Sequence, residues 1–252
     1  MASAKPQVQL IPWDFTSLEH VERLVQQRIA CGWDSEAVES WIPKQEIGNF
    51  NLQWIVGSTI SSSFSTHIFK VLSDTDPEKE SKLLKHTSAH SSENVLLLDT
   101  ATSYGGKPRS IPLPQQTFIP VGHICLGPAP AYYDDVKEPF AEGSYWISNF
   151  YVSRALQSSG LGRAAMDTAE RIATSEPLNA KMLGLNAINK VDIGSEEKYA
   201  ALKLPIPPFS NQGWYERRGY VVYMNIPKAF SKTDSTGKAW FWDAVCLKKK
   251  IA

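Results

Sequence analysis

The sequence has no excess of charge of either sign. Its 252 residues include 26 Lys and Arg and 26 Asp and Glu, so the formal net charge is zero. A neutral chain has no net field that attracts a polyanion, and we therefore expect neither nucleic acid nor an anionic membrane surface as a partner. The sequence also lacks an uninterrupted apolar run of about 18 residues, so we expect no membrane-spanning segment.

Cysteine is scarce, and its three positions match neither a disulfide framework nor the spacing of zinc ligands. They lie far apart, at Cys31, Cys125 and Cys246. Residues 1–9 lack the apolar segment of a secretory signal. These absences together predict an intracellular protein, in the cytoplasm or the nucleus, whose thiols are buried.

The five histidines show no metal-ligand spacing either. His86 and His90 stand four residues apart, but they lie in a serine-rich segment that supplies no third ligand. We expect both to be exposed to solvent and predict no metal site.

The composition is that of an ordinary globular domain, with 42% hydrophobic and 11% aromatic residues. Apolar periodicity predicts strands at 8–12, 52–56, 95–98, 118–126, 146–152, 182–185, 220–224 and 240–247. It predicts helices at 17–30, 37–42, 80–85, 160–174 and 213–218. This order favours one mixed α/β domain over residues 1–252, with loop insertions at 57–94 and 190–210.

The segment from Phe150 to Ala165 is the most informative part of the chain. A strand ends near Val152, a polar loop follows, and Gly160 and Gly162 open a helix. The N–H groups in the first turn of a helix point out of its end, and the helix dipole adds positive potential there. Glycines leave these N–H groups accessible, so the segment predicts a site for phosphate groups.

One interpretation of this loop is a dinucleotide site, because residues 160–165 match G-x-G-x-x-(G/A). Such a site expects the strand to run almost directly into the first glycine and an acidic residue about 20 positions further on. Here several residues separate Val152 from Gly160, and the next strand ends in Asn186 and Asn189. The dinucleotide interpretation therefore depends on one hexapeptide.

The whole segment resembles the signature of the GNAT superfamily of acetyl-CoA-dependent N-acetyltransferases. Its apolar-Tyr-Val strand end and (Q/R)-x-x-G-x-(G/A) loop correspond to Phe150–Val152 and Gln157–Gly162. Two further family elements follow in order. Leu183–Asn189 fits L-x-(V/L)-x-x-x-N, and Trp214–Tyr220 fits (F/L/W)-Y-E-(K/R)-x-G-(F/Y). Residues 120–126 look like the third strand of the family.

The resemblance implies a central, twisted, mostly antiparallel sheet flanked by helices, with strands four and five splayed. It also implies that the pantetheine arm of acetyl-CoA pairs with the fourth strand and that the pyrophosphate lies on the glycine loop. The residues that the resemblance places at the cofactor are Phe150, Tyr151, Val152, Gln157, Ser158, Ser159, Gly160, Leu161, Gly162, Arg163 and Asn189. The tyrosine of the third element, Tyr215, corresponds to the general acid that protonates the departing thiolate.

The sequence departs from the family pattern on the fourth strand. Many members carry an acidic residue four to six positions before the valine, but Trp146, Ile147 and Ser148 stand here. Glu142 and His123 are alternative bases, and ordered water is another. The resemblance implies direct acetyl transfer from acetyl-CoA to a primary amine of a small molecule, peptide or protein. The missing carboxylate leaves open a second hypothesis, a non-catalytic acyl-CoA-binding module on the same fold.

Overall fold

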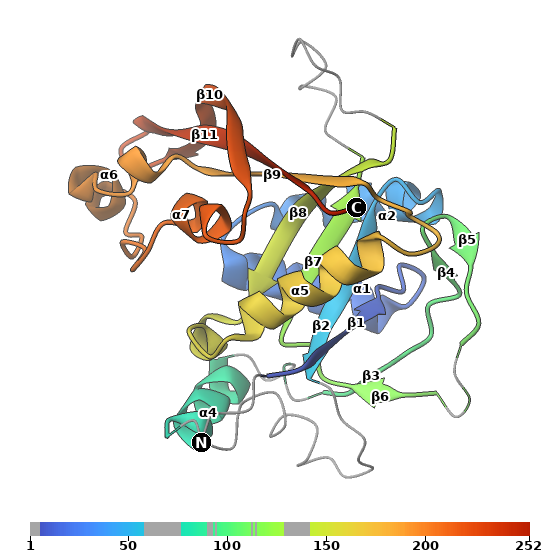
Figure 1. The fold of residues 1–252 in the computed structure, drawn as a ribbon. Helices are drawn as coiled ribbons and strands as arrows, with labels where there is room; N and C mark the ends of the chain where they lie inside the picture. The colour runs from blue at the N-terminus through green and yellow to red at the C-terminus, as the bar shows by residue number, and fades with distance from the viewer. Residues whose placement is uncertain are drawn as a thin grey trace. The chain divides into compact units, whose positions relative to one another are not determined.

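The computed structural model describes residues 6–57, 77–89, 93, 95–111, 113, 115–128 and 142–252 (Figure 1). The chain divides into two compact units. The first unit is Met1–Pro128 with Ser148–Asn179, and the second is Ala129–Ile147 with Ala180–Ala252. Strand β8 (Ser144–Val152) gives residues to both units, because the division falls within it.

The first unit contains most of the short elements. Its other strands are β1 (Val8–Pro12), β2 (Asn51–Gly57), β3 (Leu97–Leu98), β4 (Ser103–Tyr104), β5 (Lys107–Pro108), β6 (Thr117–Phe118) and β7 (Gly122–Gly127). Its helices are α1 (Leu18–Cys31), α2 (Val38–Glu46), α4 (Lys79–Ala89) and α5 (Leu161–Ala173), with the 3₁₀-helices η1 (Ser35–Ala37) and η4 (Arg154–Leu156).

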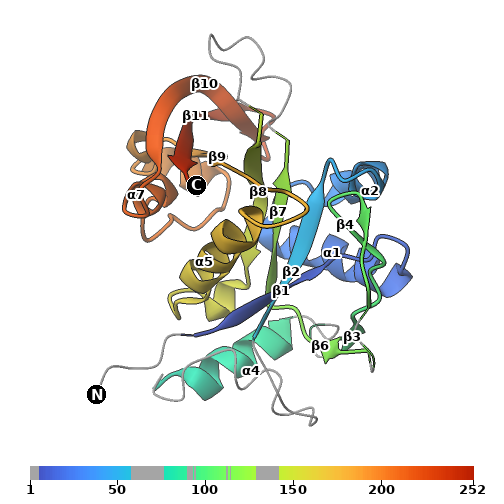
Figure 2. The same ribbon diagram turned by 45° about the vertical axis from the view of Figure 1, so that its right-hand side comes forward.

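The main strands of the first unit follow the order β1-β2-β7-β8, and β2 is antiparallel to both β1 and β7. Helix α5 lies on one face of these strands, whereas α1 and α2 lie on the other (Figure 2). Between α1, α2 and the strands is an apolar core that includes Leu24, Trp41, Leu52 and Trp54. Trp41 and Trp54 are therefore core residues, 6% and 0% exposed.

Both ends of α1 follow the local sequence. The Ser17 side chain accepts a hydrogen bond from the His20 N–H and caps the first turn. At the other end Gly32 has a φ of 86°, and its N–H donates to the carbonyl oxygens of Arg28 and Ile29. The left-handed conformation at this position favours glycine, so Cys31-Gly32 ends the helix as the sequence predicted.

Strands β7 and β8 approach each other closely at Gly122. A Cβ atom added at Gly122 would collide with the carbonyl oxygen of Tyr151. Just before this point, the Ser153 N–H donates to the carbonyl oxygen of Val121 over 2.8 Å. A side chain at position 122 would therefore push β7 away from β8 and disturb the contact that holds the end of β8 in place.

The second unit is built on long antiparallel strands. Its elements are β9 (Met182–Ile188), η5 (Lys190–Asp192), α6 (Glu196–Ala201), α7 (Asn211–Glu216), β10 (Val221–Thr233) and β11 (Ala239–Lys250). Strand β11 is antiparallel to both β9 and β10. The N-terminal part of β8 joins this unit by a parallel register that runs from Ser144–Met182 to Ile147–Leu185. The predicted fold class, a mostly antiparallel sheet flanked by helices, is confirmed.

Four local expectations need correction. The strand expected at 118–126 is interrupted, with β6 ending at Phe118 and β7 beginning at Gly122. The strand expected at 95–98 is only the short β3, which pairs with β6. Strands β4 and β5, which the sequence did not predict, form a small hairpin in which Tyr104 pairs with Lys107. The helix expected at 80–85 is longer, because α4 extends to Ala89. The rest of the 57–94 insertion lies largely outside the described residues.

No helix in the described part of the chain combines the length and the apolar character needed to cross a bilayer. The segment at 190–210, expected to be a loop insertion, carries η5 and α6. In α6, Tyr199 is 4% exposed and its ring packs edge-on against Trp242. This part of the insertion is therefore anchored in the core of the second unit.

Candidate functional site

The connection from β8 to α5 belongs entirely to the first unit from Ser148 onward. Strand β8 ends at Val152, η4 turns the chain back over Arg154–Leu156, and α5 begins at Leu161. Residues Phe150 to Arg163, which the sequence predicted as one site, thus form one continuous strand–turn–helix. Val152 and Leu161 are buried and fix the two ends of the turn.

Gly160 is the N-cap residue of α5 and has a φ of 86°. It offers no side-chain cap to the helix, and the first turn carries no acidic residue. The first backbone N–H groups of an α-helix have no partner within the helix. In α5 the first hydrogen bond between successive turns joins the Ala164 N–H to the Gly160 carbonyl oxygen, at 3.0 Å. The preceding N–H groups are oriented as an anion site requires.

The loop before the cap is held by its own polar groups. The Gln157 side-chain amide donates to the carbonyl oxygen of Val152 over 3.1 Å, and the Ser159 hydroxyl donates to the carbonyl oxygen of Leu156. Ser158 has a φ of 63°, a left-handed conformation that is uncommon for a residue with a side chain. Gln157 therefore shapes the loop through its side chain, a role that the sequence did not reveal.

Gly162 lies in the first turn of α5 beside Phe150. A Cβ added at Gly162 would come within 3.7 Å of Phe150 Cζ, which is ordinary van der Waals contact. An alanine would therefore fit, whereas a longer side chain would extend into the space beside the helix end. Arg163 follows on the exposed face of the same turn.

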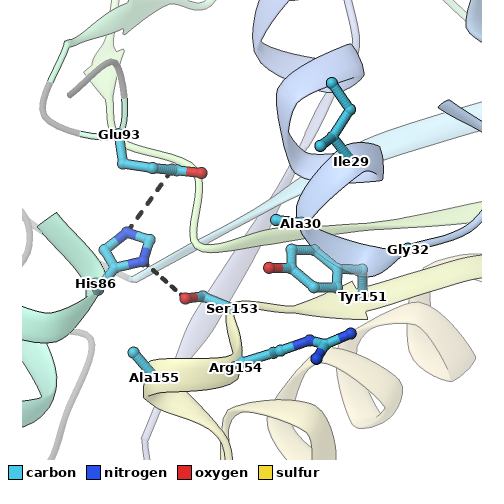
Figure 3. A pocket seen from close by; sticks show the side chains of 9 residues that line it. All are labelled: Ile29, Ala30, Gly32, His86, Glu93, Tyr151, Ser153, Arg154 and Ala155. Atoms are coloured by element: carbon cyan, nitrogen blue, oxygen red, sulfur yellow. Dashed lines mark hydrogen bonds and ion pairs between the residues drawn. The ribbon is translucent and has the colours of Figure 1, made fainter. Parts of the chain in front are cut away.

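A cavity of about 370 Å³ lies in the first unit near the end of β8 (Figure 3). Its lining comes from the end of α1, from α4, from Glu93, and from the start of the β8–α5 connection. The lining residues are Ile29, Ala30, Gly32, His86, Glu93, Tyr151, Ser153, Arg154 and Ala155. A volume of this size lies within the range of small-molecule sites.

Two titratable side chains and one hydroxyl group meet in this cavity. Nδ1 of His86 lies 2.8 Å from Oγ of Ser153, and Nε2 of the same ring lies 3.8 Å from Oε2 of Glu93 (Figure 3). The expectation that His86 is exposed is wrong, because its exposed fraction is 1%. Helix α4 brings the ring against η4, and this contact between distant segments has no local signature. His90 lies outside the described residues.

The sequence predicted no functional role for His86, which was expected to be exposed, or for Glu93 and Ser153. A partial signal was present, because Leu83 and His86 stand three residues apart and so share one face of a helix. Leu83 is 5% exposed, which shows that this face is buried. Neither Glu93 nor Ser153 has a comparable neighbour in the sequence.

Tyr151 lines the same cavity, and its ring lies 5.4 Å from that of His123. Burial raises the pKa of Tyr151 to about 12, so its hydroxyl group stays protonated at neutral pH. His123 is fully buried and bonded to Gln27 Oε1 over 3.0 Å. Burial, together with nearby Arg28, lowers its pKa well below the ordinary value. Such a histidine remains neutral, but it is enclosed in the core.

Arg154 extends from the same turn to the C-terminal end of α1. Its Nη2 donates to the carbonyl oxygen of Cys31 over 3.2 Å, although the side chain remains exposed. A guanidinium group at a helix C-terminus stabilises the carbonyl groups that have no partner there. Arg154 thus ties the β8–α5 connection to α1.

Asn189 and Tyr215 lie in the second unit. Asn189 caps η5, because its side chain accepts a hydrogen bond from the Val191 N–H at 3.1 Å. Tyr215 lies in α7, with its ring 4.9 Å from Trp214 and 5.8 Å from Tyr220. Its exposed fraction is 8%, and burial raises its pKa. The hydroxyl group therefore stays protonated at neutral pH.

The part of β8 that precedes Phe150 provides no carboxylate. Trp146 and Ile147 are buried, and Ser148 follows them. Glu142 is exposed in a turn before the strand. The departure from the family pattern therefore places apolar side chains on the strand where many members carry the base.

Comparison with known proteins relates part of the chain to one family. The model of the acetyltransferase (GNAT) family matches residues 77–194, which include β7, β8, α5 and β9. Residues 77–194 are therefore similar to the GNAT acetyltransferase family, as the motifs within this range indicated. The matched range contains the strand–turn–helix at Phe150–Arg163 and ends before the element that carries Tyr215. No curated protein matches the chain.

Solved structures of similar fold include NAA60 from Arabidopsis thaliana in complex with acetyl-CoA. It is 11% identical, the match covers 97% of this chain and 99% of that chain, and the TM-score is 0.48. Another is aminoglycoside 6'-N-acetyltransferase from Enterococcus faecium, 11% identical over 97% of each chain, with a TM-score of 0.49.

Proposed function

We propose that the protein transfers an acetyl group from acetyl-CoA to a primary amine by direct attack in a ternary complex. The observation that carries the proposal is the glycine-capped start of α5 within the stretch that the GNAT model matches. There Gly160 leaves the first-turn N–H groups without a side-chain cap. A dianionic pyrophosphate is a fitting ligand for such a helix end.

The cofactor-binding residues of the proposal lie along this connection. Phe150, Tyr151 and Val152 form the end of the strand that would pair with the pantetheine arm. The pyrophosphate would contact the N–H groups of Gln157, Ser158, Ser159, Gly160, Leu161, Gly162 and Arg163. Asn189 completes the set, although the bond from Val191 gives its side chain a capping role of its own.

Tyr215 is the proposed general acid. When the amine attacks the thioester, the departing thiolate needs a proton, and a buried tyrosine with a raised pKa is protonated at neutral pH. Trp214 and Tyr220 pack against its ring and hold it in one orientation. No carboxylate of β8 is available as the base, so we propose that ordered water accepts the proton of the amine.

The acceptor is proposed only as a class, a primary amine of a small molecule, peptide or protein. The test is the release of CoA thiol from acetyl-CoA in the presence of a panel of primary amines, including polyamines, aminoglycosides and peptides with free N-termini. Acetylated product identified by mass spectrometry supports the proposal. Absence of product with every amine, despite bound acetyl-CoA, would favour the alternative.

That alternative is a non-catalytic acyl-CoA-binding module. One observation favours it, the apolar Trp146 and Ile147 where many family members carry a carboxylate. The two proposed functions make different predictions for Tyr215, because a non-catalytic acyl-CoA-binding module does not need its hydroxyl group. Loss of turnover in a Tyr215→Phe variant that still binds CoA would eliminate the alternative.

A further inference from the structure

Ser153, His86 and Glu93 form a cluster that acetyl transfer from acetyl-CoA does not use. They come from three distant segments, yet all three line the same cavity (Figure 3). Their exposed fractions are 8%, 1% and 4%. Burying a histidine and a carboxylate costs free energy unless each has partners, so the cluster requires an explanation.

The order of contacts is that of a nucleophile, a base and an orienting carboxylate. Ser153 Oγ lies 2.8 Å from Nδ1 of His86, and Glu93 Oε2 lies 3.8 Å from Nε2 of the same ring. When Nδ1 accepts the serine proton, the proton of the neutral ring is on Nε2, which lies 3.8 Å from the carboxylate, an ion-pair distance rather than a hydrogen-bond distance. This tautomer can take a second proton, with Glu93 stabilising the imidazolium that forms.

Glu93 is itself held in place from α1. Its Oε2 lies 3.4 Å from Nε2 of Gln27 and 3.7 Å from Nη1 of Arg23. Arg23 also donates through Nη2 to the carbonyl oxygen of Val95 over 2.8 Å. The contacts with Gln27, Arg23 and His86 all converge on Oε2, so α1 helps to hold the carboxylate oxygen that faces the ring.

The cavity in front of Ser153 has room for a small ligand. Its volume is about 370 Å³, and Ile29, Ala30 and Ala155 give it an apolar wall. The Tyr151 hydroxyl group is directed toward the side of the cavity where Ser153 and His86 lie (Figure 3). A small apolar acyl group beside a hydroxyl donor fits this lining.

We propose that Ser153 is a nucleophile, activated by His86 and Glu93, and that it cleaves small carboxylic esters with short acyl chains. This activity is separate from acetyl transfer and does not depend on the proposed function. In this proposal helix α4 has a catalytic role, because it brings His86 to the β8–α5 connection.

The reaction balances within the cluster and the ester. Ser153 Oγ forms a bond to the ester carbonyl carbon while its proton passes to Nδ1 of His86. The bond to the alcohol oxygen breaks, and the leaving alcohol takes that proton, which leaves an acyl-serine. Water then attacks the acyl-serine, with His86 again accepting and returning one proton, and the products are a carboxylic acid and free Ser153.

The direct test is covalent labelling of the full-length wild-type protein with a fluorophosphonate, followed by peptide mass mapping. The expected result is one phosphonylated residue, Ser153. Hydrolysis of p-nitrophenyl acetate should accompany it and should stop after labelling. Because the mapping uses the wild type, the result does not depend on whether a variant folds.

Variants then test the roles of the partners. His86→Gln should lower the rate of labelling roughly 100-fold, which is the lower range for loss of a general base. Glu93→Gln should lower it by less, because the ring keeps its contact with Ser153. Ser88→Ala is the matched control, since Ser88 is an exposed serine on the same helix as His86, and its labelling should equal that of the wild type.

Two outcomes would overturn the proposal. One is a wild-type protein in which Ser153 stays unlabelled, or in which the label falls on another residue. The other is labelling of Ser153 that His86→Gln leaves unchanged while the melting temperature falls, which would make the pair a structural link between α4 and η4. Neither outcome bears on acetyl-CoA binding, which is measured separately.

Discussion

The Cβ position of Gly162 lies 3.7 Å from Cζ of Phe150, so the last residues of β8 border the first turn of α5. This distance leaves room for a methyl group and directs any longer side chain along the helix end. The N–H groups proposed to bind pyrophosphate belong to the same turn. Substitutions at position 162 can therefore test cofactor binding without a collision that would disturb the fold.

Gly162→Leu should weaken acetyl-CoA binding at least tenfold, because the side chain would cover the first turn of α5 where the pyrophosphate is proposed to lie. Gly162→Ala should change the dissociation constant much less, since its Cβ makes only ordinary contact. Isothermal titration with acetyl-CoA measures both. Each tenfold change corresponds to about 1.4 kcal/mol.

Gly194→Leu is the control for this pair. A Cβ at Gly194 meets no atom within 4 Å, so the substitution adds the same side chain without a collision and outside the β8–α5 segment of the sequence. Its acetyl-CoA affinity should match that of the wild type. Equal binding by the Gly162→Leu variant and the wild type would instead make the loop a plain turn.

Tyr215→Phe should lower kcat for acetyl transfer roughly 100-fold, because general acid catalysis contributes about that much or more. The ring would keep its contacts with Trp214 and Tyr220, so the melting temperature should change little. Steady-state kinetics with acetyl-CoA and an accepted amine measure the effect. A variant with unchanged kcat would remove Tyr215 from the mechanism.

The free energy of unfolding should fall as the solution is acidified from about pH 7 to about pH 5.5. His20 is held neutral, because its Nδ1 accepts from the Trp54 indole over 3.1 Å while Nε2 lies 2.9 Å from the Leu98 carbonyl oxygen. Burial lowers its pKa and that of His123. The unfolded chain binds protons near the ordinary histidine value, whereas the folded chain does not, so acid favours unfolding.

Urea denaturation at the two pH values measures this dependence. The loss is at most about 1.4 kcal/mol per pH unit for each histidine. Replacing His123 by Gln should make the dependence shallower, because one of the two contributing groups is then absent. A stability that stays constant over this interval would contradict the neutral, buried state of both rings.

Asp234 at the turn between β10 and β11 should titrate far below an ordinary carboxyl group. It accepts hydrogen bonds from the Thr236 hydroxyl over 2.6 Å and from the Trp240 indole over 2.8 Å. These bonds, with that of Thr236 the largest cause, lower its pKa to about 2. Its contribution to the turn is present above the ordinary value of 3.8 and is lost as the pH falls toward 2.

A carboxyl titration followed by NMR tests this value directly. The Thr236→Ala variant should shift the midpoint upward, toward 3.8, because the hydroxyl donor is lost. An Asp234 that titrates near 3.8 in the wild type would show that the turn does not hold these bonds in solution.

Local sequence was enough to predict the strand–turn–helix of the candidate site. The β-type run before Val152, the glycines at 160 and 162 and the apolar spacing of α5 are short-range signals, and the structure has each element there. The ends of α1 were predictable for the same reason, since Ser17 and Gly32 form hydrogen bonds with residues close to them in the sequence.

Contacts between distant segments were not predictable in this way. His86 belongs to a segment of polar composition, and its burial involves a contact with Ser153, 67 residues away. The break between β6 and β7 also depends on distant pairing, because β6 pairs with β3 while β7 pairs with β2. Apolar periodicity indicates which face of a helix or strand is buried, but it does not indicate which other helix or strand covers that face.

The central claim, that the β8–α5 loop binds the pyrophosphate of acetyl-CoA, is tested most directly by thermal unfolding with acetyl-CoA, CoA and NADPH in parallel. A ligand at a hundred times its dissociation constant adds about 2.7 kcal/mol of stability, a shift of roughly 5 °C or more for a chain of this size. The account predicts this shift with acetyl-CoA and CoA and none with NADPH. No shift with either CoA species, or an equal shift with NADPH, would contradict it.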